Sequence, residues 1–480
     1  MPVSAESKIA ITVTPVVHTM PADLLTPLAV YLKLSENSTH SFLLESVEGG
    51  RSLARYSFVG ADPEMVVRGT DRQVEITNDD GPATRQIGLI DFLKEHLDQN
   101  IAGADQELPA FIGGAIGYLG FDCCEWFEPS LRQPDTAAEG AFMIFRSIVA
   151  FDHARQVVSI ISLADSTETR DTFAEANDRN QKIRERLEGP ASAIPQDATG
   201  AATIETTSNW SRKDFEAAVS SIKDLIYAGE CYQAVLSQCF TRPTSASAIA
   251  IYRALRSLNP SPYMFLLRFD QRSVIGASPE MLVRCQERRL DYRPIAGTRP
   301  RGRTPLEDEQ LAEEMRQDEK EVAEHVMLVD LGRNDLGRVA KYGTVHIETL
   351  MNVEKYSHVQ HLVSSLSAEL RDGLSCFDAL AACFPAGTVS GAPKVRAIEI
   401  IRGLEPTPRG VYAGAVGYFG YSGNMDTCIA IRTLVLENGV ARIQAGAGIV
   451  ADSVPALEFE ETVNKAAGLM RAIDLAEGRQ

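Results

Sequence analysis

A glycine-rich pattern occurs twice in the chain. Residues 113–122 read GGAIGYLGFD and residues 413–422 read AGAVGYFGYS, so that small, apolar and aromatic residues recur in register around three glycines. A repeat at a long period indicates that a supersecondary unit is used more than once. The pattern predicts that two parts of the chain carry similar sheets. The alternative is a chance recurrence in a glycine-rich strand.

The composition is that of a large globular protein with an acidic surface. The 480 residues are 44% hydrophobic and 23% charged, with a formal net charge of −18. This is enough apolar material for a large core, and the length suggests two or three domains. The negative charge argues against nucleic acid as a main partner, and it means that an anionic substrate needs a locally basic pocket.

Targeting signals and disulfides are not expected. No apolar run reaches the length of a membrane-spanning helix. The N-terminus, MPVSAESKIAITVTP, lacks the basic and apolar parts of a signal peptide. The eight cysteines show no CxxC pair and no regular spacing, which is typical of reduced, buried thiols. We therefore expect a cytoplasmic protein.

Apolar patterning predicts several elements along the chain. Residues 40–68 read as β-rich, and residues 139–163 read as two strands around a turn near Asp152. A polar helix is expected at about 165–187. Another helix is expected to begin at Ser211, which Asp214 follows in a capping-box-like position.

A linker is predicted between two domains. Residues 188–207 are rich in Ala, Thr, Pro and Gly and show no apolar period. We therefore predict an N-terminal domain at 10–187 and a C-terminal domain at 208–475.

Residues 294–302 form a stiff, cationic stretch, PIAGTRPRG, with two prolines, two glycines and two arginines. In so acidic a protein this loop is the first candidate for a basic pocket. Gly297 and Thr298 lie at its centre.

Two pairs of glutamates lie at helical spacing. Residues 309–337 read as one helix, whose apolar stripe consists of Leu311, Met315, Val322, Val326 and Val329. Beside the stripe, Glu321 and Glu324 share one face, and Glu458 and Glu461 repeat the spacing near the C-terminus. A single pair is most often a solvated helix face. Two pairs among apolar residues suit Mg²⁺, which prefers hard oxygen ligands.

Further features point to an anion site. The stretch FPAGTVSGAPK at 384–394 runs into a helix whose first N–H groups can bind an anion, although a structural turn is an equal alternative. In QAGAGIVADS at 444–453, two glycines allow a carboxylate to approach the backbone. Arg432 lies in an apolar, strand-like run and needs an acidic partner or an anionic ligand. His361 alone is more often structural. Together these features predict a pocket for a small dianion and Mg²⁺.

Nine motifs resemble the large subunits of anthranilate synthases, which are chorismate-utilising enzymes. The resemblance covers nearly the whole chain and is densest from Ser208 to Ala472. The motifs are GECYQAVLSQ, GASPEML, PIAGTRPRG, DEKEVAEHVMLVDLGRND, HLVSSL, FPAGTVSGAPK, YAGAVGYFG, IAIRT and AGAGIVADSVPALEFEETVNKA. The family implies an α/β fold of the α+β type, with stacked, largely antiparallel sheets covered by helices.

The resemblance implies a reaction and roles for residues. Chorismate would be aminated at C2 with loss of the C4 hydroxyl, and elimination of pyruvate would then give anthranilate, the first committed step toward tryptophan. Glu280 matches the general acid for the leaving hydroxyl, and His361 matches a histidine implicated in proton transfer and pyruvate loss. Mg²⁺ would be held, directly or through water, by Glu321, Glu324, Glu458 and Glu461. The substrate-binding set would comprise Gly297, Thr298, Thr388, Tyr412, Arg432, Gly446, Ala447, Gly448 and Lys465.

Two positions separate this chain from related enzymes. The enzymes that make 4-amino-4-deoxychorismate carry a nucleophilic lysine where this chain has Ala296, and alanine cannot attack the ring. Isochorismate and salicylate synthases carry a lysine base where this chain has Gln233. Glutamine is a poor base, so the resemblance implies ammonia rather than water as the nucleophile.

The resemblance also implies feedback control and a partner. LLES at 43–46 resembles one wall of a tryptophan site, and NPSPYMF at 259–265 resembles the other. The residues of this site would be Glu45, Ser46, Pro262, Tyr263 and Met264. No glutamine amidotransferase domain is found, so a separate glutaminase subunit (component II) is expected, in a heterodimer or in a heterotetramer made of two heterodimers. Two alternatives are a 2-amino-2-deoxyisochorismate synthase, which retains the pyruvyl group, and a non-catalytic tryptophan-sensing subunit.

Overall fold

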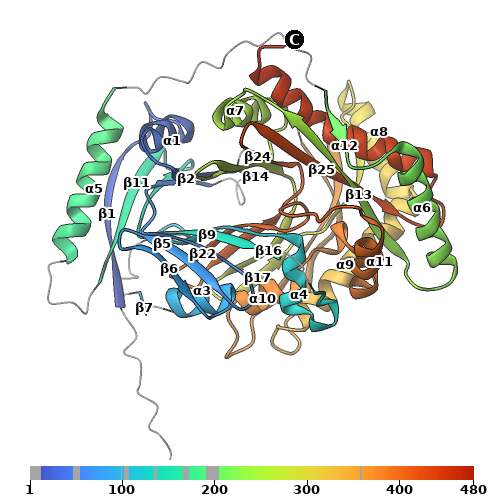
Figure 1. Ribbon diagram of the computed structural model, residues 1–480, viewed down its shortest axis with the longest axis horizontal. Coiled ribbons are helices and arrows are strands. Elements are labelled where there is room, and N and C mark those ends of the chain that lie inside the picture. Colours follow the sequence, from blue (N-terminus) through green and yellow to red (C-terminus); the bar gives the residue numbers. More distant parts are fainter. Residues whose placement is uncertain are drawn as a thin grey trace, which may run out of the picture.

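Two large β-sheets are stacked face to face, and helices cover their outer faces (Figure 1). The computed structural model describes residues 12–46, 55–98, 100–101, 107–134, 138–165, 172–190, 205–356 and 359–479. Pairing is antiparallel throughout the described strands, except where β7 joins β1 in parallel. The predicted architecture of stacked, largely antiparallel sheets is confirmed.

The first sheet has thirteen strands among the described residues. Twelve follow one another across the sheet, and the thirteenth, β21 (Gly391–Ala392), pairs with β13. The order is β12 (Thr207–Ser208), β13 (Gln233–Pro243), β25 (Val440–Ile449), β24 (Thr433–Glu437), β15 (Arg272–Ser278), β14 (Tyr263–Phe269), β2 (His40–Glu45), β3 (Tyr56–Ala61), β10 (Ser147–Asp152), β11 (Val157–Asp165), β1 (Thr12–Pro21) and β7 (Asn100–Ile101).

The second sheet has twelve described strands. One of them, β19 (His346–Lys355), pairs only with β20. The others follow in the order β18 (Ile295–Pro300), β20 (Val359–Glu369), β17 (Arg289–Tyr292), β16 (Met281–Gln286), β23 (Met425–Ile429), β22 (Ala415–Gly420), β8 (Gly114–Leu119), β9 (Gly140–Phe145), β4 (Met65–Gly69), β5 (Val74–Asn78) and β6 (Gly81–Arg85).

Helices pack on both outer faces. On the first sheet α1, α5, α7 and α12 contact its strands, and on the second sheet α3, α9 and α10 do so. The α-helices are α1 (Pro27–Ser35), α3 (Leu89–Leu97), α4 (Cys124–Phe127), α5 (Thr172–Glu188), α6 (Arg212–Tyr227), α7 (Ala248–Leu258), α8 (Pro305–Gln317), α9 (Glu319–Gly337), α10 (Cys376–Cys383), α11 (Lys394–Leu404) and α12 (Pro455–Ala476). The described residues also form three short 3₁₀ turns, η1 (Phe121–Cys123), η2 (Pro129–Leu131) and η3 (Gly387–Val389). No described helix is long and apolar enough to cross a membrane.

The repeated glycine pattern forms the centre of the second sheet. Its two copies, β8 and β22, pair with each other, and Gly117 lies directly opposite Gly417. A Cβ at Gly117 would lie 1.9 Å from the carbonyl oxygen of Ala141 on β9, and a Cβ at Gly417 would lie 2.1 Å from that of Asp426 on β23. Only glycine lets the neighbouring strands approach this closely.

The order of strands is the same on both sides of the centre. Outward from the β14–β2 junction, β15, β24, β25 and β13 on one side correspond to β3, β10, β11 and β1 on the other. The sequence carries a second echo at corresponding positions, since VGADPEMVVR (59–68) and IGASPEMLVR (275–284) differ at only three of ten residues. The prediction that two parts of the chain carry similar sheets is therefore confirmed.

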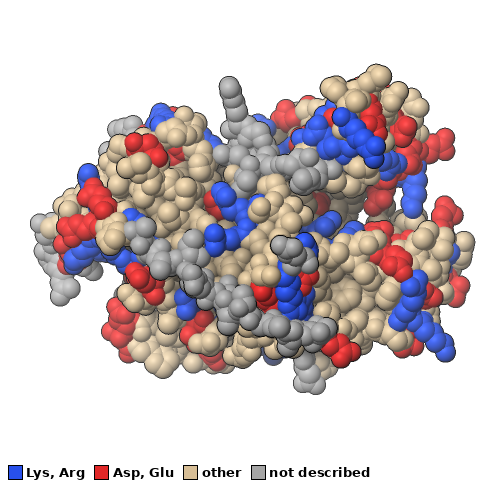
Figure 2. Space-filling model, turned by 90° about the horizontal axis from the view of Figure 1, so that it is seen from above, with Lys and Arg blue, Asp and Glu red and all other residues tan. Residues whose placement is uncertain are grey.

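Both sheets contain strands from both sides of the predicted domain boundary. The N-terminal β2 pairs with the C-terminal β14, and β8 pairs with β22. Most of the linker, residues 191–204, lies outside the described residues, and the division into two domains stays a prediction. All eight cysteines are free, and seven are buried. On the face seen in Figure 2, positive and negative side chains are interspersed.

Two predicted elements were wrong in detail. Residues 139–163 form three strands, because the chain leaves the second sheet after β9 and enters the first at β10. The single helix predicted at 309–337 is two helices, because Asp318 ends α8 and caps α9 by accepting from the N–H groups of Lys320 and Glu321. Val326, placed in the apolar stripe, is 42% exposed. The helix that starts after Ser211 is confirmed, with the serine hydroxyl as its cap.

Candidate active site

A cavity of about 520 Å³ lies in the C-terminal half, between the two sheets and the first turns of α9 and α12. Every site residue predicted for catalysis, substrate or metal lines it, except Ala447. The set is Gln233, Glu280, Gly297, Thr298, Glu321, Glu324, His361, Thr388, Tyr412, Arg432, Gly446, Gly448, Glu458, Glu461 and Lys465. Ala447 is fully buried on the adjoining strand β25 and does not reach the cavity.

Glu280 is a buried carboxyl group at the cavity wall. It follows β15 and is 6% exposed. Burial raises its pKa to about 8, although hydrogen bonds from Thr388 and the Ile295 backbone and the charge of Lys465 oppose the shift. The Thr388 hydroxyl donates to Glu280 Oε2 at 3.3 Å. A carboxyl group with this pKa is protonated at neutral pH, as a general acid must be.

His361 is held in one orientation by β18. Its Nδ1 lies 2.9 Å from the carbonyl oxygen of Gly297 and 3.1 Å from the hydroxyl of Thr298. Because a carbonyl can only accept, we assign the proton to Nδ1, which leaves Nε2 free to accept a proton. Burial lowers the pKa of His361, so the ring is neutral near pH 7.

Arg432 does not lie in a strand, as the sequence suggested. The chain crosses from β23 in one sheet to β24 in the other, and Arg432 ends the crossing with φ +50°. A non-glycine residue in this region is strained, which is common at functional sites. Burial lowers the pKa of its guanidinium. No hydrogen bond or ion pair joins that group to any side chain in the described part of the chain, so an anionic ligand is the partner it lacks.

The four glutamates lie on the first turns of α9 and α12. Arg299 Nη1 contacts Glu321 Oε1 at 3.0 Å, and Lys465 Nζ contacts Glu461 Oε1 at 2.6 Å. Burial and the charge of Glu321 raise the pKa of Glu324. Burial also raises the pKa of Glu458, with a smaller contribution in the same direction from the charge of Glu461. Burial therefore raises the pKa of one glutamate on each helix.

The glutamates fit a hard divalent cation by their chemistry. They supply only carboxylate oxygens, which Mg²⁺ prefers. Burial is the main cause of the raised pKa values of Glu324 and Glu458, and the charges of Glu321 and Glu461 add to it, so a cation beside these two groups would favour their charged forms. In the part of the chain that the structure describes, no three Asp, Glu, His or Cys side chains converge to hold an ion. Arg299 and Lys465 now occupy two of the carboxylates, so ion binding requires these two cations to move.

Two glycines of β25 make room for side chains of the cavity wall. A Cβ at Gly446 would lie 2.7 Å from the Tyr412 hydroxyl, and a Cβ at Gly448 would lie 2.4 Å from Gln233 Nε2. The side chains of Tyr412 and Gln233 thus fill the space that the sequence had suggested for a carboxylate. Gln233 is 4% exposed, and its Oε1 has no hydrogen-bond partner among the described residues.

Replacing Gly448 by Ala is expected to lower kcat/KM by about 10- to 100-fold, because the new methyl group displaces the Gln233 amide by an ångström or more. The fold should survive, since the clash involves the end of a flexible side chain. Gly403→Ala is the control, because a Cβ there meets nothing within 4 Å. Steady-state kinetics and thermal unfolding of both variants test this. Equal kcat/KM values for the two variants would contradict the expectation.

The arginines of PIAGTRPRG do not form the cavity wall. This stretch is mostly strand β18, whose Ile295, Ala296, Gly297 and Thr298 face the cavity. Arg299 pairs with Asp318 and Glu321, and Arg301 pairs with Asp308. The stretch therefore lines the cavity as expected, but its arginines hold α8 and α9 against β18 and do not make the pocket basic.

The turn before α11 lines the cavity, but the helix start was predicted to bind an anion. Thr388 and Val389 of η3 line the cavity, whereas Lys394 at the start of α11 pairs with the buried Asp335 at 2.8 Å. Sequence reasoning missed Lys320 and Gln444, which also line the cavity. The sequence position of Lys320 could have identified it, because this residue directly precedes the first glutamate pair. Nothing in the sequence marked Gln444.

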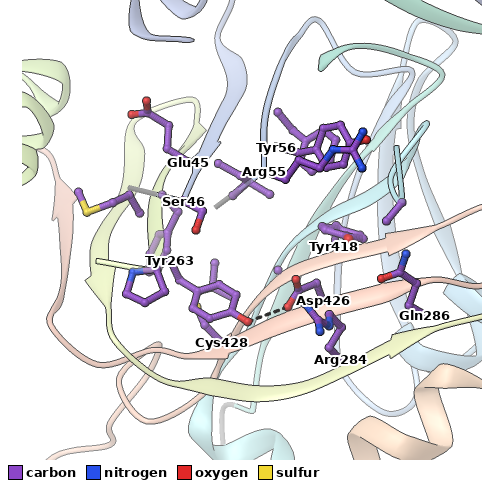
Figure 3. A pocket seen from close by; sticks show the side chains of 18 of the residues that line it. Glu45, Ser46, Arg55, Tyr56, Tyr263, Arg284, Gln286, Tyr418, Asp426 and Cys428 are labelled. Atoms are coloured by element: carbon purple, nitrogen blue, oxygen red, sulfur yellow. Dashed lines mark hydrogen bonds between the residues drawn. The ribbon is translucent and has the colours of Figure 1, made fainter. Parts of the chain in front are cut away.

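A second cavity of about 420 Å³ lies where the two halves of the chain meet, and the five residues predicted to form a tryptophan site line it. Figure 3 shows Tyr263 donating to Asp426 on its floor, at 3.0 Å. Burial raises the pKa of Asp426 to about 6. Ser46 Oγ is buried and has no partner in the described chain. The carboxylate of Glu45 is bound by Tyr252 and by Arg256 of α7, and Figure 3 shows it turned away from the other labelled residues.

Known proteins are similar to this chain in sequence. The model of the chorismate binding enzyme family matches residues 39–471. Anthranilate synthase component 1 of Pseudomonas aeruginosa is 45% identical over 467 residues, which cover 95% of this chain and 94% of the relative. The same component of Geobacillus stearothermophilus is 44% identical over 486 residues, covering 96% and 94%.

Solved structures agree. Anthranilate synthase component I of Streptococcus pneumoniae TIGR4 superposes with a TM-score of 0.78 at 34% identity, covering 94% of this chain and 98% of that one. The menaquinone-specific isochorismate synthase of Escherichia coli, at 21% identity, has a TM-score of 0.72 over 98% of this chain and 96% of its own and shares the fold. The chain therefore belongs to the chorismate binding enzyme family.

Proposed function

We propose that this chain is the chorismate-using component of an anthranilate synthase, which aminates chorismate at C2 with ammonia and eliminates pyruvate. The observation that carries the proposal is one cavity lined by a protonated carboxyl group, a neutral histidine and an arginine that has no ion pair among the described residues. The relatives named anthranilate synthase component 1 support the same reaction.

The first step needs an acid for a poor leaving group. Glu280, held by the Thr388 hydroxyl, would give its proton to the departing C4 hydroxyl. Arg432, which lacks an acidic partner among the described residues, would bind a carboxylate of the substrate. Ala296 offers no nucleophile and Gln233 no base, so the cavity favours ammonia as the attacking group.

The second step needs a base. His361 has a free Nε2 in the tautomer that the Gly297 carbonyl selects, and it would take the proton released when pyruvate leaves. A 2-amino-2-deoxyisochorismate synthase, which stops before this step, is the runner-up. The non-catalytic tryptophan sensor is disfavoured, because a sensor has no use for the protonated Glu280.

Mg²⁺ is the proposed cofactor. Glu321, Glu324, Glu458 and Glu461 would hold it, directly or through water. When bound, the ion supplies charge that neutralises the ring carboxylate of the substrate. Lys465 also donates to the Gly446 carbonyl at 3.1 Å, and once freed from Glu461 it would turn its charge to the substrate.

A glutaminase subunit (component II) is the proposed source of ammonia in a heterodimer or heterotetramer, and a cytoplasmic location is proposed with it. Free ammonia should replace the subunit at alkaline pH.

The second cavity is the proposed site of feedback inhibition by tryptophan. Aromatic side chains of both halves and the unpartnered Ser46 hydroxyl suit an aromatic amino acid. Tyr263 pairs across the strands with Ser278, whose Oγ accepts from the Glu280 N–H at 3.3 Å. Tryptophan bound beside Tyr263 would therefore shift the strands that hold the acid.

Replacing Leu108 by Trp is expected to reduce sensitivity to tryptophan by about 100-fold, or roughly 3 kcal/mol of binding, because the indole of the variant fills the cavity. Basal turnover should stay within about twofold, since Leu108 lies outside the active-site cavity. Leu32→Trp is the control, because Leu32 lines another cavity of about 470 Å³ beside α1 and α7. Inhibition curves for both variants check this, and a Leu108 variant that keeps wild-type inhibition would exclude this cavity as the tryptophan site.

The proposed function is tested by a fluorescence time course with purified chain, chorismate, Mg²⁺ and an ammonium salt at alkaline pH, with mass spectrometry of the products. Anthranilate that disappears with EDTA supports the proposal. Chorismate consumed to a product that retains the pyruvyl group supports the runner-up, and no consumption refutes both.

A further inference from the structure

Arg409 is buried behind three segments of the active-site wall without lining the cavity. It follows α11, and its side chain is 2% exposed. A buried arginine is retained only where its five N–H donors find partners. The partners that Arg409 has found are therefore informative.

Two of the partners are backbone carbonyls of cavity residues. Nη1 donates to the carbonyl of Val389 at 2.7 Å, and Nη2 donates to that of Val235 at 2.6 Å. Both residues line the cavity. One guanidinium therefore ties turn η3 to strand β13.

A buried carboxylate holds the guanidinium in place. Glu405 accepts from Arg409 Nε at 2.8 Å and from Nη2 at 2.7 Å. The same carboxylate accepts from the N–H and the hydroxyl of Ser237, and that hydroxyl also accepts from Gln444 Nε2 at 2.8 Å. Gln444 is a third cavity residue in this network.

Aromatic rings close the remaining sides. The guanidinium carbon lies 4.5 Å from the centre of the Phe121 ring and 5.5 Å from that of Tyr412. Tyr412 lines the cavity, and Phe121 belongs to the N-terminal half. Cation–π contacts of this kind are strong when desolvated.

We propose that Arg409 is a positioning residue, which holds the Val389 carbonyl so that the neighbouring Thr388 hydroxyl meets the carboxyl group of Glu280. Thr388 and Val389 share one 3₁₀ turn, and the Thr388–Glu280 hydrogen bond, at 3.3 Å, is longer than usual and sensitive to displacement. The inference rests on the proposed reaction, in which Glu280 is the acid.

A double-mutant cycle on kcat tests this. Arg409→Met is expected to lower kcat by about 30-fold, within the range for a catalytic group displaced by an ångström. In a Thr388→Val background, which has no hydroxyl to position, the same change should cost less than about threefold. Arg409→Lys keeps a charge beside Glu405 but cannot reach both carbonyls, so it should lower kcat by about 10-fold. In the Thr388→Val background this effect should again be smaller. It replaces Arg409→Met if that variant does not fold.

Arg402→Met is the matched control. Arg402 is 8% exposed and pairs with Asp122 and Glu125, so its loss also leaves buried charges. None of its hydrogen-bond or ion-pair partners in the described chain lines the active-site cavity. Its kcat should stay within about threefold, whatever happens to thermal stability. The proposal would be overturned if Arg409→Met lowered kcat by the same factor in the wild-type and Thr388→Val backgrounds. It would also be overturned if Arg402→Met lowered kcat as much as Arg409→Met does. Wild-type protein that makes no anthranilate would instead refute the proposed function itself.

Discussion

Replacing Glu280 by Gln is expected to lower turnover of chorismate by about 10²- to 10⁴-fold, the usual contribution of a general acid. Glutamine matches the shape of the carboxyl group but cannot give a proton to the leaving hydroxyl. The control is Glu64→Gln, because Glu64 holds the corresponding place in VGADPEMVVR and lies outside the cavity. Product formation is followed by fluorescence. Loss of activity in both variants alike would contradict the role of Glu280.

The same group sets a pH dependence. Because the pKa of Glu280 is raised to about 8, kcat for the wild-type protein, expressed per concentration of free ammonia, should fall about tenfold per unit above that pH. Burial also raises this pKa above its value of 4.5 in the unfolded chain. The stability that the protonated group contributes is therefore lost as pH rises through about 8. The Gln variant should keep that stability at pH 9, which thermal unfolding of the two proteins would show.

Replacing Glu461 by Gln is expected to reduce Mg²⁺-dependent turnover at least about 100-fold, because one of the four carboxylates proposed to hold the ion is lost. Titration calorimetry should show Mg²⁺ affinity lowered by about 10- to 100-fold. Tryptophan binding in the second cavity should be unchanged.

Glu460→Gln is the control for this change. Glu460 is the next residue on α12, but it pairs with Arg212 at 2.7 Å and does not line the active-site cavity. A Glu461 variant that binds Mg²⁺ as tightly as the Glu460 variant would remove the basis for the magnesium site.

Local patterns in the sequence predicted much of this structure. The cap at Ser211, the β-rich segment at 40–68 and the repeated glycine strands all depend on near neighbours, which a sequence displays directly. The resemblance named fifteen residues that meet in one cavity. The roles of these residues stay predictions.

Features that depend on distant contacts could not be predicted. Arg432 reads as part of one apolar strand, because the two strands on either side of it belong to different sheets that only the fold distinguishes. The arginines after Thr298 marked their stretch as a candidate basic pocket, because the sequence does not show that their acidic partners lie on α8 and α9. Arg409 was not singled out, since two of its partners are backbone carbonyls, which every residue has, and its contacts with Val235 and Phe121 join distant parts of the chain.

The pairing of β2 with β14 and of β8 with β22 has a consequence for synthesis on the ribosome. Nearly 300 residues separate Leu119 from Ala415, its partner across the central ladder. At cellular translation rates, the N-terminal half waits roughly 15 to 60 s with two open strand edges before their partners emerge. Open edges of this kind recruit other chains. Nascent chains of this protein should therefore depend on holding chaperones, and a fragment that ends at residue 190 should aggregate.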